Sequence, residues 1–141
     1  MKILLAVDGS DYSRRAAAYV GQHAGLLAEA PELHVLHVHP PLPYPGAANI
    51  VGKAAIESYQ RDESLAALAV AQKALEGSRS VPKASWCVGD VVEEVGRYVE
   101  RNAIDLIVVG SHGRGAMSTL ALGSVTMKIL ASLKTPVLVV R

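Results

Sequence analysis

The chain has 141 residues, the size of one ordinary domain, and its 14 basic and 13 acidic residues leave a formal charge of +1. This balance excludes the strong basic field of a typical nucleic-acid binder, and the single cysteine, Cys87, excludes an internal disulfide framework. Hydrophobic residues make up 50% of the chain, but Phe is absent, so the core must consist mainly of Val, Leu, Ile and Ala, as in parallel sheets covered by helices.

The first half of the chain predicts two buried strands and two helices. Residues 2–7 and 33–38 are continuous aliphatic runs, typical of parallel strands that are buried on both faces. Between them, Asp8-Gly9-Ser10-Asp11 supplies two N-cap candidates for a helix. Residues 40–52 are rich in proline and predict a long loop, neither regular helix nor central strand. A long Ala-rich helix is expected over residues 53–76.

The second half continues the alternation of strands and helices. Residues 82–88 are of mixed polarity, which favours an edge strand, and a capping arrangement at Asp90 and Glu93 starts the next helix. Residues 104–109 predict another buried strand. Ser124 is the expected cap of the last helix, and Pro136 to Val140 form the last strand. The order predicts one α/β domain over residues 1–141, with right-handed crossovers and helices on both faces of a mostly parallel sheet.

The loop that leads from Gly110 to Ser124 is the most informative stretch. Glycines allow backbone N–H groups to approach a ligand closely, because no Cβ obstructs them. The start of the following helix carries unpaired N–H groups and the positive end of the helix dipole, and Arg114 adds a charge. These features predict a phosphate site; the alternative is a turn whose glycines only change the direction of the chain.

Two common nucleotide motifs are excluded by particular residues. No Lys follows Gly123, so the loop is not a Walker A sequence. The first turn, Asp8-Gly9-Ser10, is not the glycine fingerprint of dinucleotide-binding proteins, and no acidic residue follows the second strand. The remaining pattern, G-x2-G-x9-G-[S/T], fits Gly110, Gly113 and Gly123-Ser124.

Four segments together resemble the universal stress protein family, over essentially the whole chain: Asp8-Gly9-Ser10, Val88-Gly89-Asp90, the glycine loop, and Gly123-Ser124-Val125 before the last strand. The resemblance implies a single-domain, open, Rossmann-like parallel sheet of five strands in the order 3-2-1-4-5. It also implies binding of ATP, or of AMP or ADP, because the ATP-binding subgroup carries this glycine motif. Many relatives have Pro where this chain has Val91, a departure that should affect rigidity more than binding.

Carried over by position, the resemblance implies a set of residues around the nucleotide. They are Asp8, Gly9, Ser10, Val38, Gly89, Gly110, Ser111, Gly113, Arg114, Gly123, Ser124 and Val125. Val38 would meet the adenine through its backbone. Asp8 would lie near the ribose, the phosphates or a Mg²⁺ ion, although it could instead be a helix cap. With strands 1 and 4 adjacent, a crevice should open beyond their carboxyl ends, at Asp8 and Gly110.

Other polar residues have less specific interpretations. His34 and His37 should project from opposite faces of a strand, and His39 shares the face of His37, so three metal ligands would not converge. His112 could touch phosphate or face solvent. Cys87 is expected to be a buried small hydrophobe rather than a reactive thiol.

The resemblance favours a nucleotide-binding regulatory protein of the stress response, without catalytic residues. A slow ATPase or phosphotransferase stays open, since Asp8, His112 and Arg114 supply part of what phosphoryl transfer needs. An interaction module without nucleotide is the second alternative. No signal or membrane-spanning segment is apparent, so we expect a cytoplasmic protein without membrane or nucleic-acid partners. Relatives form homodimers through the last strand, which implies a homodimer through Pro136 to Val140.

Overall fold

The computed structural model describes residues 1–42, 46–78, 80–115 and 121–141. Parts of the predicted proline-rich loop (43–45) and glycine loop (116–120) lie outside these ranges. At its centre is a parallel sheet in the order β3-β2-β1-β4-β5, which confirms the architecture and strand order that the resemblance implied. The strands are β1 (Lys2–Val7), β2 (Glu32–His39), β3 (Lys83–Val88), β4 (Leu106–Gly110) and β5 (Val137–Val140).

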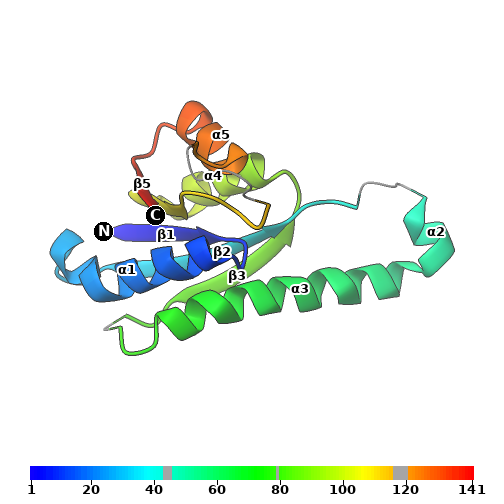
Figure 1. Ribbon diagram of the computed structural model, residues 1–141, viewed down its shortest axis with the longest axis horizontal. Helices are drawn as coiled ribbons and strands as arrows, with labels where there is room; N and C mark the ends of the chain where they lie inside the picture. The colour runs from blue at the N-terminus through cyan, green and yellow to red at the C-terminus, as the bar shows by residue number, and fades with distance from the viewer. Residues whose placement is uncertain (43–45, 79, 116–120) are drawn as a thin grey trace.

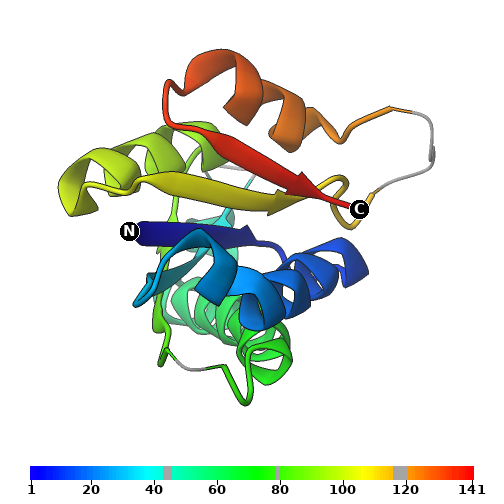
Figure 2. The ribbon, with the colours of Figure 1, turned by 90° about the vertical axis from the view of Figure 1, so that its left-hand side faces the viewer.

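Helices cover both faces of this sheet, as Figures 1 and 2 show. On one face lie α1 (Asp11–Leu27) and α3 (Lys53–Ala74), and on the other lie α4 (Val91–Asn102) and α5 (Ser124–Ser132). The short helix α2 (Ala47–Val51) and the first half of α3 extend beyond the end of the sheet (Figure 1). Two hydrophobic cores therefore lie on either side of a single layer of strands.

The aliphatic runs become central strands because both of their faces are covered. Ile3 and Leu5 of β1 belong to the core against α1 and α3, whereas Leu4 between them belongs to the core against α4 and α5. All three are at most 2% exposed. The mixed strand β3 lies at one edge with most of its residues partly or fully exposed, as its composition predicted.

Two local predictions were wrong. Residues 40–52 were expected to contain no regular helix, but Ala47–Val51 forms one, because the prolines end before this segment. Ser124 was expected to cap the last helix, but the cap position is Gly123, and Ser124 is the first helical residue. The cap has no side-chain hydrogen bond, which matters for the site below.

The topology positions the carboxyl ends of β1 and β4 side by side. The chain leaves β1 toward α1 on one face and leaves β4 toward α5 on the other, so these two strands flank the topological switch point of the sheet. Ligands of open α/β sheets bind in the crevice that opens there. None of the helices in the described ranges has the length and apolar character that a bilayer crossing requires.

Candidate functional site at the switch point

A cavity of about 350 Å³ lies at the switch point. This volume is in the range of sites for small ligands. Eight of the twelve residues predicted to surround a nucleotide line it: Asp8, Val38, Gly110, Gly113, Arg114, Gly123, Ser124 and Val125. The structure thus brings together strand ends and a helix start that are distant in the sequence.

One wall of the cavity is apolar. It is formed by Leu36 and Val38 of β2, Val91 and Val95 of α4, and Ile129 of α5. Of these, the sequence reasoning assigned only Val38 to the site. Leu36 could have been found, because it lies two residues before Val38 on the same face of the strand. The residues of α4 and α5 carry only the ordinary pattern of an inward helix face.

The glycines of the loop permit close packing around this cavity. A Cβ at Gly110 would lie 2.8 Å from Tyr12 of α1, and one at Gly113 would lie 2.7 Å from Oδ2 of Asp8. A Cβ at Gly123 would lie 3.1 Å from Cα of His112. Gly110 therefore allows the strand to pass close to α1, whereas Gly113 and Gly123 hold the loop against the other residues of the site.

The N-terminus of α5 opens into the same cavity. The N–H of Gly123 donates to the carbonyl of Ser111 (2.8 Å), and the next two amides, of Ser124 and Val125, have no acceptor among the described residues. The Thr126 hydroxyl donates to the carbonyl of Gly110 (2.9 Å), which fixes the helix start against β4. Free amides at the positive end of a helix dipole favour an anion.

Asp8 joins the first turn to the glycine loop. Its Oδ1 accepts from the N–H of Ser10 (2.9 Å) and the hydroxyl of Ser13 (2.7 Å), and its Oδ2 accepts from the N–H of Arg114 (3.1 Å). Burial by itself would raise the pKa of Asp8, but these hydrogen bonds outweigh it and hold the pKa below its ordinary value. Asp8 is therefore an ionised carboxylate at the cavity wall, and it is not the cap of α1.

The other four predicted residues do not line the cavity. Ser10 is the N-cap of α1, with its hydroxyl accepting from the N–H of Ser13 (3.2 Å). Gly9 has a φ of 78°, which favours glycine. Ser111 is fully buried, and its N–H donates to the carbonyl of Val140 (2.7 Å).

Gly89, the last of these four, belongs to the turn after β3. Its N–H donates to the carbonyl of His39 (3.0 Å), and a Cβ there would approach the side chain of Glu94 to 2.7 Å. Nearby, Cys87 packs partly buried against the core. Its pKa is raised by burial and by Glu94, so its thiol is less ionised than usual, in keeping with the predicted role of a small hydrophobe.

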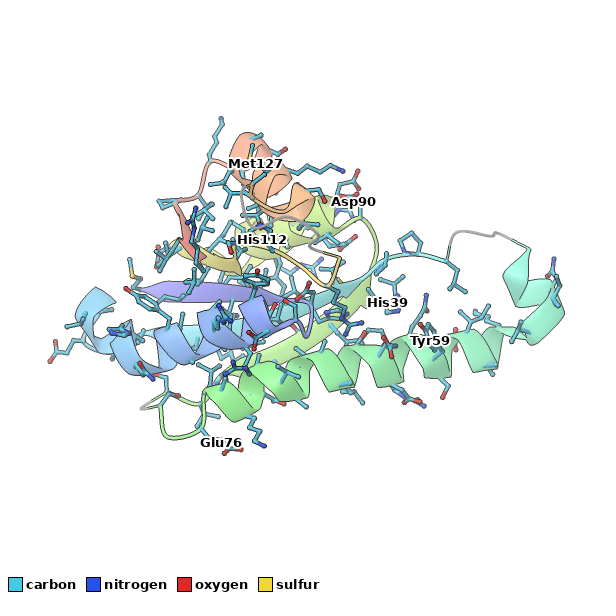
Figure 3. All side chains as sticks on the ribbon, viewed as in Figure 1. His39, Tyr59, Glu76, Asp90, His112 and Met127 are labelled. Carbon is cyan, nitrogen blue, oxygen red and sulfur yellow. The ribbon has the colours of Figure 1, made fainter. Side chains whose placement is uncertain are left out.

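His112 is another residue that lines the cavity. Its ring, labelled in Figure 3, lies 4.9 Å from that of Tyr12, and its Nδ1 is 3.0 Å from the hydroxyl of Ser111. Its Nε2 is buried and has no hydrogen-bond partner among the described residues. The residue lines the cavity, but the Nε2 atom itself is enclosed by the protein.

The three histidines of β2 diverge, as the strand periodicity predicted. His34 contacts Tyr98 of α4 (2.9 Å) and Glu32 (2.8 Å). On the other face, Nδ1 of His37 bonds to the carbonyl of Val7 (2.8 Å), and burial lowers the pKa of His37. The ring of His39 lies edge-on to that of Tyr59 of α3; both residues are labelled in Figure 3.

A doubly wound parallel sheet with a cavity at its switch point defines a ligand-binding type of α/β protein. The model of the universal stress protein family matches residues 1–141, and the chain therefore belongs to this family. It is 36% identical over 141 residues to a universal stress protein of Thermus aquaticus, covering 99% of this chain and 97% of that one. It is 32% identical over 140 residues to one of Synechocystis sp., covering 99% of this chain but only 42% of that protein.

Solved structures share the fold. Protein MJ0577 of Methanocaldococcus jannaschii superposes with a TM-score of 0.80 at 28% identity, over 99% of this chain and 94% of that one. A universal stress protein in complex with cAMP has a TM-score of 0.70 at 24% identity (100% and 97% covered). One from Archaeoglobus fulgidus in complex with dAMP has a TM-score of 0.69 at 19% identity, over 100% of this chain and 98% of that one. One from Arabidopsis thaliana with AMP bound has a TM-score of 0.64 at 16% identity, over 99% of this chain and 90% of that one.

Proposed function

We propose that this chain binds an adenine nucleotide, ATP or its mono- or diphosphate, and acts as a cytoplasmic regulatory protein of the stress response. The observation that carries the proposal is the convergence of three features in one cavity with an apolar wall: α5 amides that have no acceptor among the described residues, closely packed glycines and an ionised carboxylate. A nucleotide has the matching division into a flat apolar base and an anionic end. The relatives that hold cAMP, dAMP and AMP add support.

In this proposal the base packs against the apolar wall, with Val38 beside the adenine. The phosphates accept hydrogen bonds from the amides of Ser124 and Val125, which have no acceptor among the described residues.

The carboxylate of Asp8 fits a Mg²⁺ ion that arrives with the nucleotide. Its Oδ2 accepts one hydrogen bond, from Arg114, and so retains a lone pair. Mg²⁺ in nucleotide sites is commonly held by one or two carboxylates together with phosphate oxygens and waters. When bound, the ion would neutralise phosphate charge beside Asp8.

Titration calorimetry with ATP tests the site. Gly113→Val and Gly123→Val should lose affinity by about a hundredfold or more, because their side chains invade the space beside Asp8 and the loop. Gly25→Val is the matched control, since a Cβ at Gly25 meets nothing within 4 Å and Gly25 is remote from the cavity. Unchanged ATP affinity in both loop variants would contradict the proposal.

Two further measurements separate the alternatives. Acid precipitation of the protein purified from cells should release an adenine nucleotide into the supernatant. Incubation with Mg²⁺ and ATP should leave the ATP intact over hours if the protein is a binder. Phosphate release that Asp8→Ala abolishes would indicate an enzyme instead.

We also propose a homodimer formed through Pro136 to Val140. β5 is an edge strand with four half-buried aliphatic residues. The carbonyl of Val140 accepts from Ser111, so the backbone of Val140 faces β4 and that of Val139 faces outward. Val139→Pro should therefore give monomers in light scattering while Val139→Thr stays dimeric; a monomeric wild type at micromolar concentration would refute the dimer.

A further inference from the structure

The guanidinium of Arg114 pairs with helix α3. The backbone N–H of Arg114 is anchored to Asp8, but Nη1 of its side chain donates to Oε2 of Glu63 at 3.1 Å. The two side chains are 54% and 40% exposed. The pair thus connects the glycine loop to the helix that covers the opposite face of the sheet from α5.

Gly9 makes room for this pair. A Cβ at Gly9 would lie 2.9 Å from Nη2 of Arg114 and 3.1 Å from Cα of Ala67 on α3. The absence of a side chain at Gly9 therefore leaves room for the guanidinium over the first turn. This gives Gly9, which does not line the cavity, a part in the charge arrangement beside it.

Few charged residues lie around the mouth of the cavity. Among the described residues that line it, Arg114 is the only Lys or Arg, and Asp8 is the only Asp or Glu. Glu63 stands just outside and adds a second negative charge within bonding distance of Arg114. A polyphosphate that approaches this mouth finds the nearest cation already paired with a carboxylate.

Resting on the proposed nucleotide function, we propose that Glu63 is a specificity-determining residue that competes with the ligand's phosphates for Arg114. Surface ion pairs between partly exposed side chains are weak, whereas a guanidinium binds phosphate strongly and with two parallel hydrogen bonds. Phosphates therefore displace Glu63 from Arg114 at the cost of part of their binding free energy. Glu63 thereby sets how strongly affinity depends on the phosphate charge of the nucleotide.

The test compares ligands that share a base and differ in charge. Calorimetric affinities are measured for adenosine, AMP and ATP, with the wild type and with Glu63→Gln, which keeps the shape of the side chain and removes its charge. Glu63→Gln should tighten ATP about tenfold, AMP about threefold, and adenosine by less than twofold, because only charged ligands compete for Arg114.

A control substitution on the same helix separates the effect of removing the charge at position 63 from the effect of changing the net charge of the protein. Glu57 also lies on α3, pairs with Lys53 and is 63% exposed, and it does not line the cavity. Glu57→Gln makes the same change of net charge as Glu63→Gln. It should leave all three affinities within twofold of the wild type.

A double substitution separates competition between Glu63 and the phosphates for Arg114 from direct electrostatic repulsion between Glu63 and the phosphates. With Arg114→Gln in place, no Lys or Arg remains among the described residues that line the cavity, so adding Glu63→Gln should tighten ATP by less than about threefold. Equal tightening of ATP with and without Arg114, or equal tightening of all three ligands, would overturn the role of Glu63 and leave nucleotide binding intact. A wild type that binds none of the three would refute the proposed function itself.

Discussion

The two turns at the switch point follow the neighbouring strands β1 and β4. The helices to which they lead, α1 and α5, begin with different kinds of cap. In the β1–α1 turn, Ser10 caps the helix by accepting from Ser13, and Asp8 accepts from both residues. In the β4–α5 turn, the cap is Gly123, which has no side chain, and its own N–H goes back to Ser111. The first helix start thus has one amide, that of Ser13, bonded to the side chain of its cap, whereas Gly123 offers the α5 amides no side-chain acceptor. Under the proposed function, this difference favours the α5 side of the crevice for the phosphates.

Giving α5 a side-chain cap like that of α1 should have the largest effect on ATP affinity. In Gly123→Asp the new carboxylate would accept from the α5 amides and repel phosphate, so ATP affinity should fall by more than about a hundredfold in calorimetry. The backbone of Gly123 (φ −60°, ψ 151°) suits any residue.

Gly123→Ala is the control for this change. It adds the same Cβ, 3.1 Å from Cα of His112, without the charge. It should therefore lose less affinity than the Asp variant. Equal losses in the two variants would mean that steric displacement of the loop, and not competition for the amides, explains the effect.

Asp8→Ala should break the connection between the two turns. It leaves the N–H groups of Ser10 and Arg114 and the hydroxyl of Ser13 without their acceptor. We expect the free energy of unfolding, measured with urea at pH 7, to fall by about 1–3 kcal/mol. An unchanged midpoint and slope of the transition would show that water replaces the carboxylate at no cost.

The same substitution should change the response to acid. Because the folded-state pKa of Asp8 is below its ordinary value of 3.8, its ionised form stabilises the folded state above that pH, and the contribution is lost as pH falls through the folded-state pKa. The difference in unfolding free energy between wild type and Asp8→Ala should therefore shrink below about pH 4. A constant difference from pH 7 to pH 2 would contradict the hydrogen-bonding account.

The contrast between the turns was only half predictable from the sequence. Runs rich in aliphatic residues predicted the central strands, because strands covered on both faces consist mainly of such residues, and the strand order came from the family resemblance. Ser124 was misassigned as the cap because cap preferences are statistical, whereas Gly123 is held at that position by its bond to Ser111. The short helix Ala47–Val51 was missed because the whole segment 40–52 was treated as proline-rich, although its helix-breaking prolines stop at Pro45.

The site residues that were predicted are those whose role depends on the backbone of the glycine loop. Those that were missed are brought to the site only by tertiary packing. Glycine spacing indicated Gly110, Gly113 and Gly123, which all line the cavity. Nothing local indicated Glu63, because its partner Arg114 is 51 residues away and meets it only through the packing of α3 against the first turn. The long helix α3 also carries two other acidic residues, Glu57 and Asp62, with no sequence signal to distinguish them from Glu63.

Ser10→Ala should affect folding and leave binding unchanged. It removes the side-chain cap of α1, and the loss of such a cap costs about 1 kcal/mol of unfolding free energy. Ser10 does not line the cavity, so ATP affinity in calorimetry should stay within about twofold of the wild type. A tenfold loss of affinity without loss of stability would place Ser10 among the ligand contacts and remove the contrast between the turns.

Ser124→Ala should show the opposite pattern to Ser10→Ala, with binding affected and stability unchanged, and its effect should be the smallest of those considered. Ser124 is exposed, lines the cavity and follows the cap position, so its hydroxyl stabilises no helix end and its loss should change the unfolding free energy by less than about 0.5 kcal/mol. If the hydroxyl donates to a phosphate, ATP affinity should fall about three- to tenfold while adenosine affinity stays constant. Because the amide of Ser124 survives the substitution, a larger loss would assign most of the binding to the side chain rather than to the helix start. An equal loss for adenosine would place the hydroxyl at the ribose instead of the phosphates.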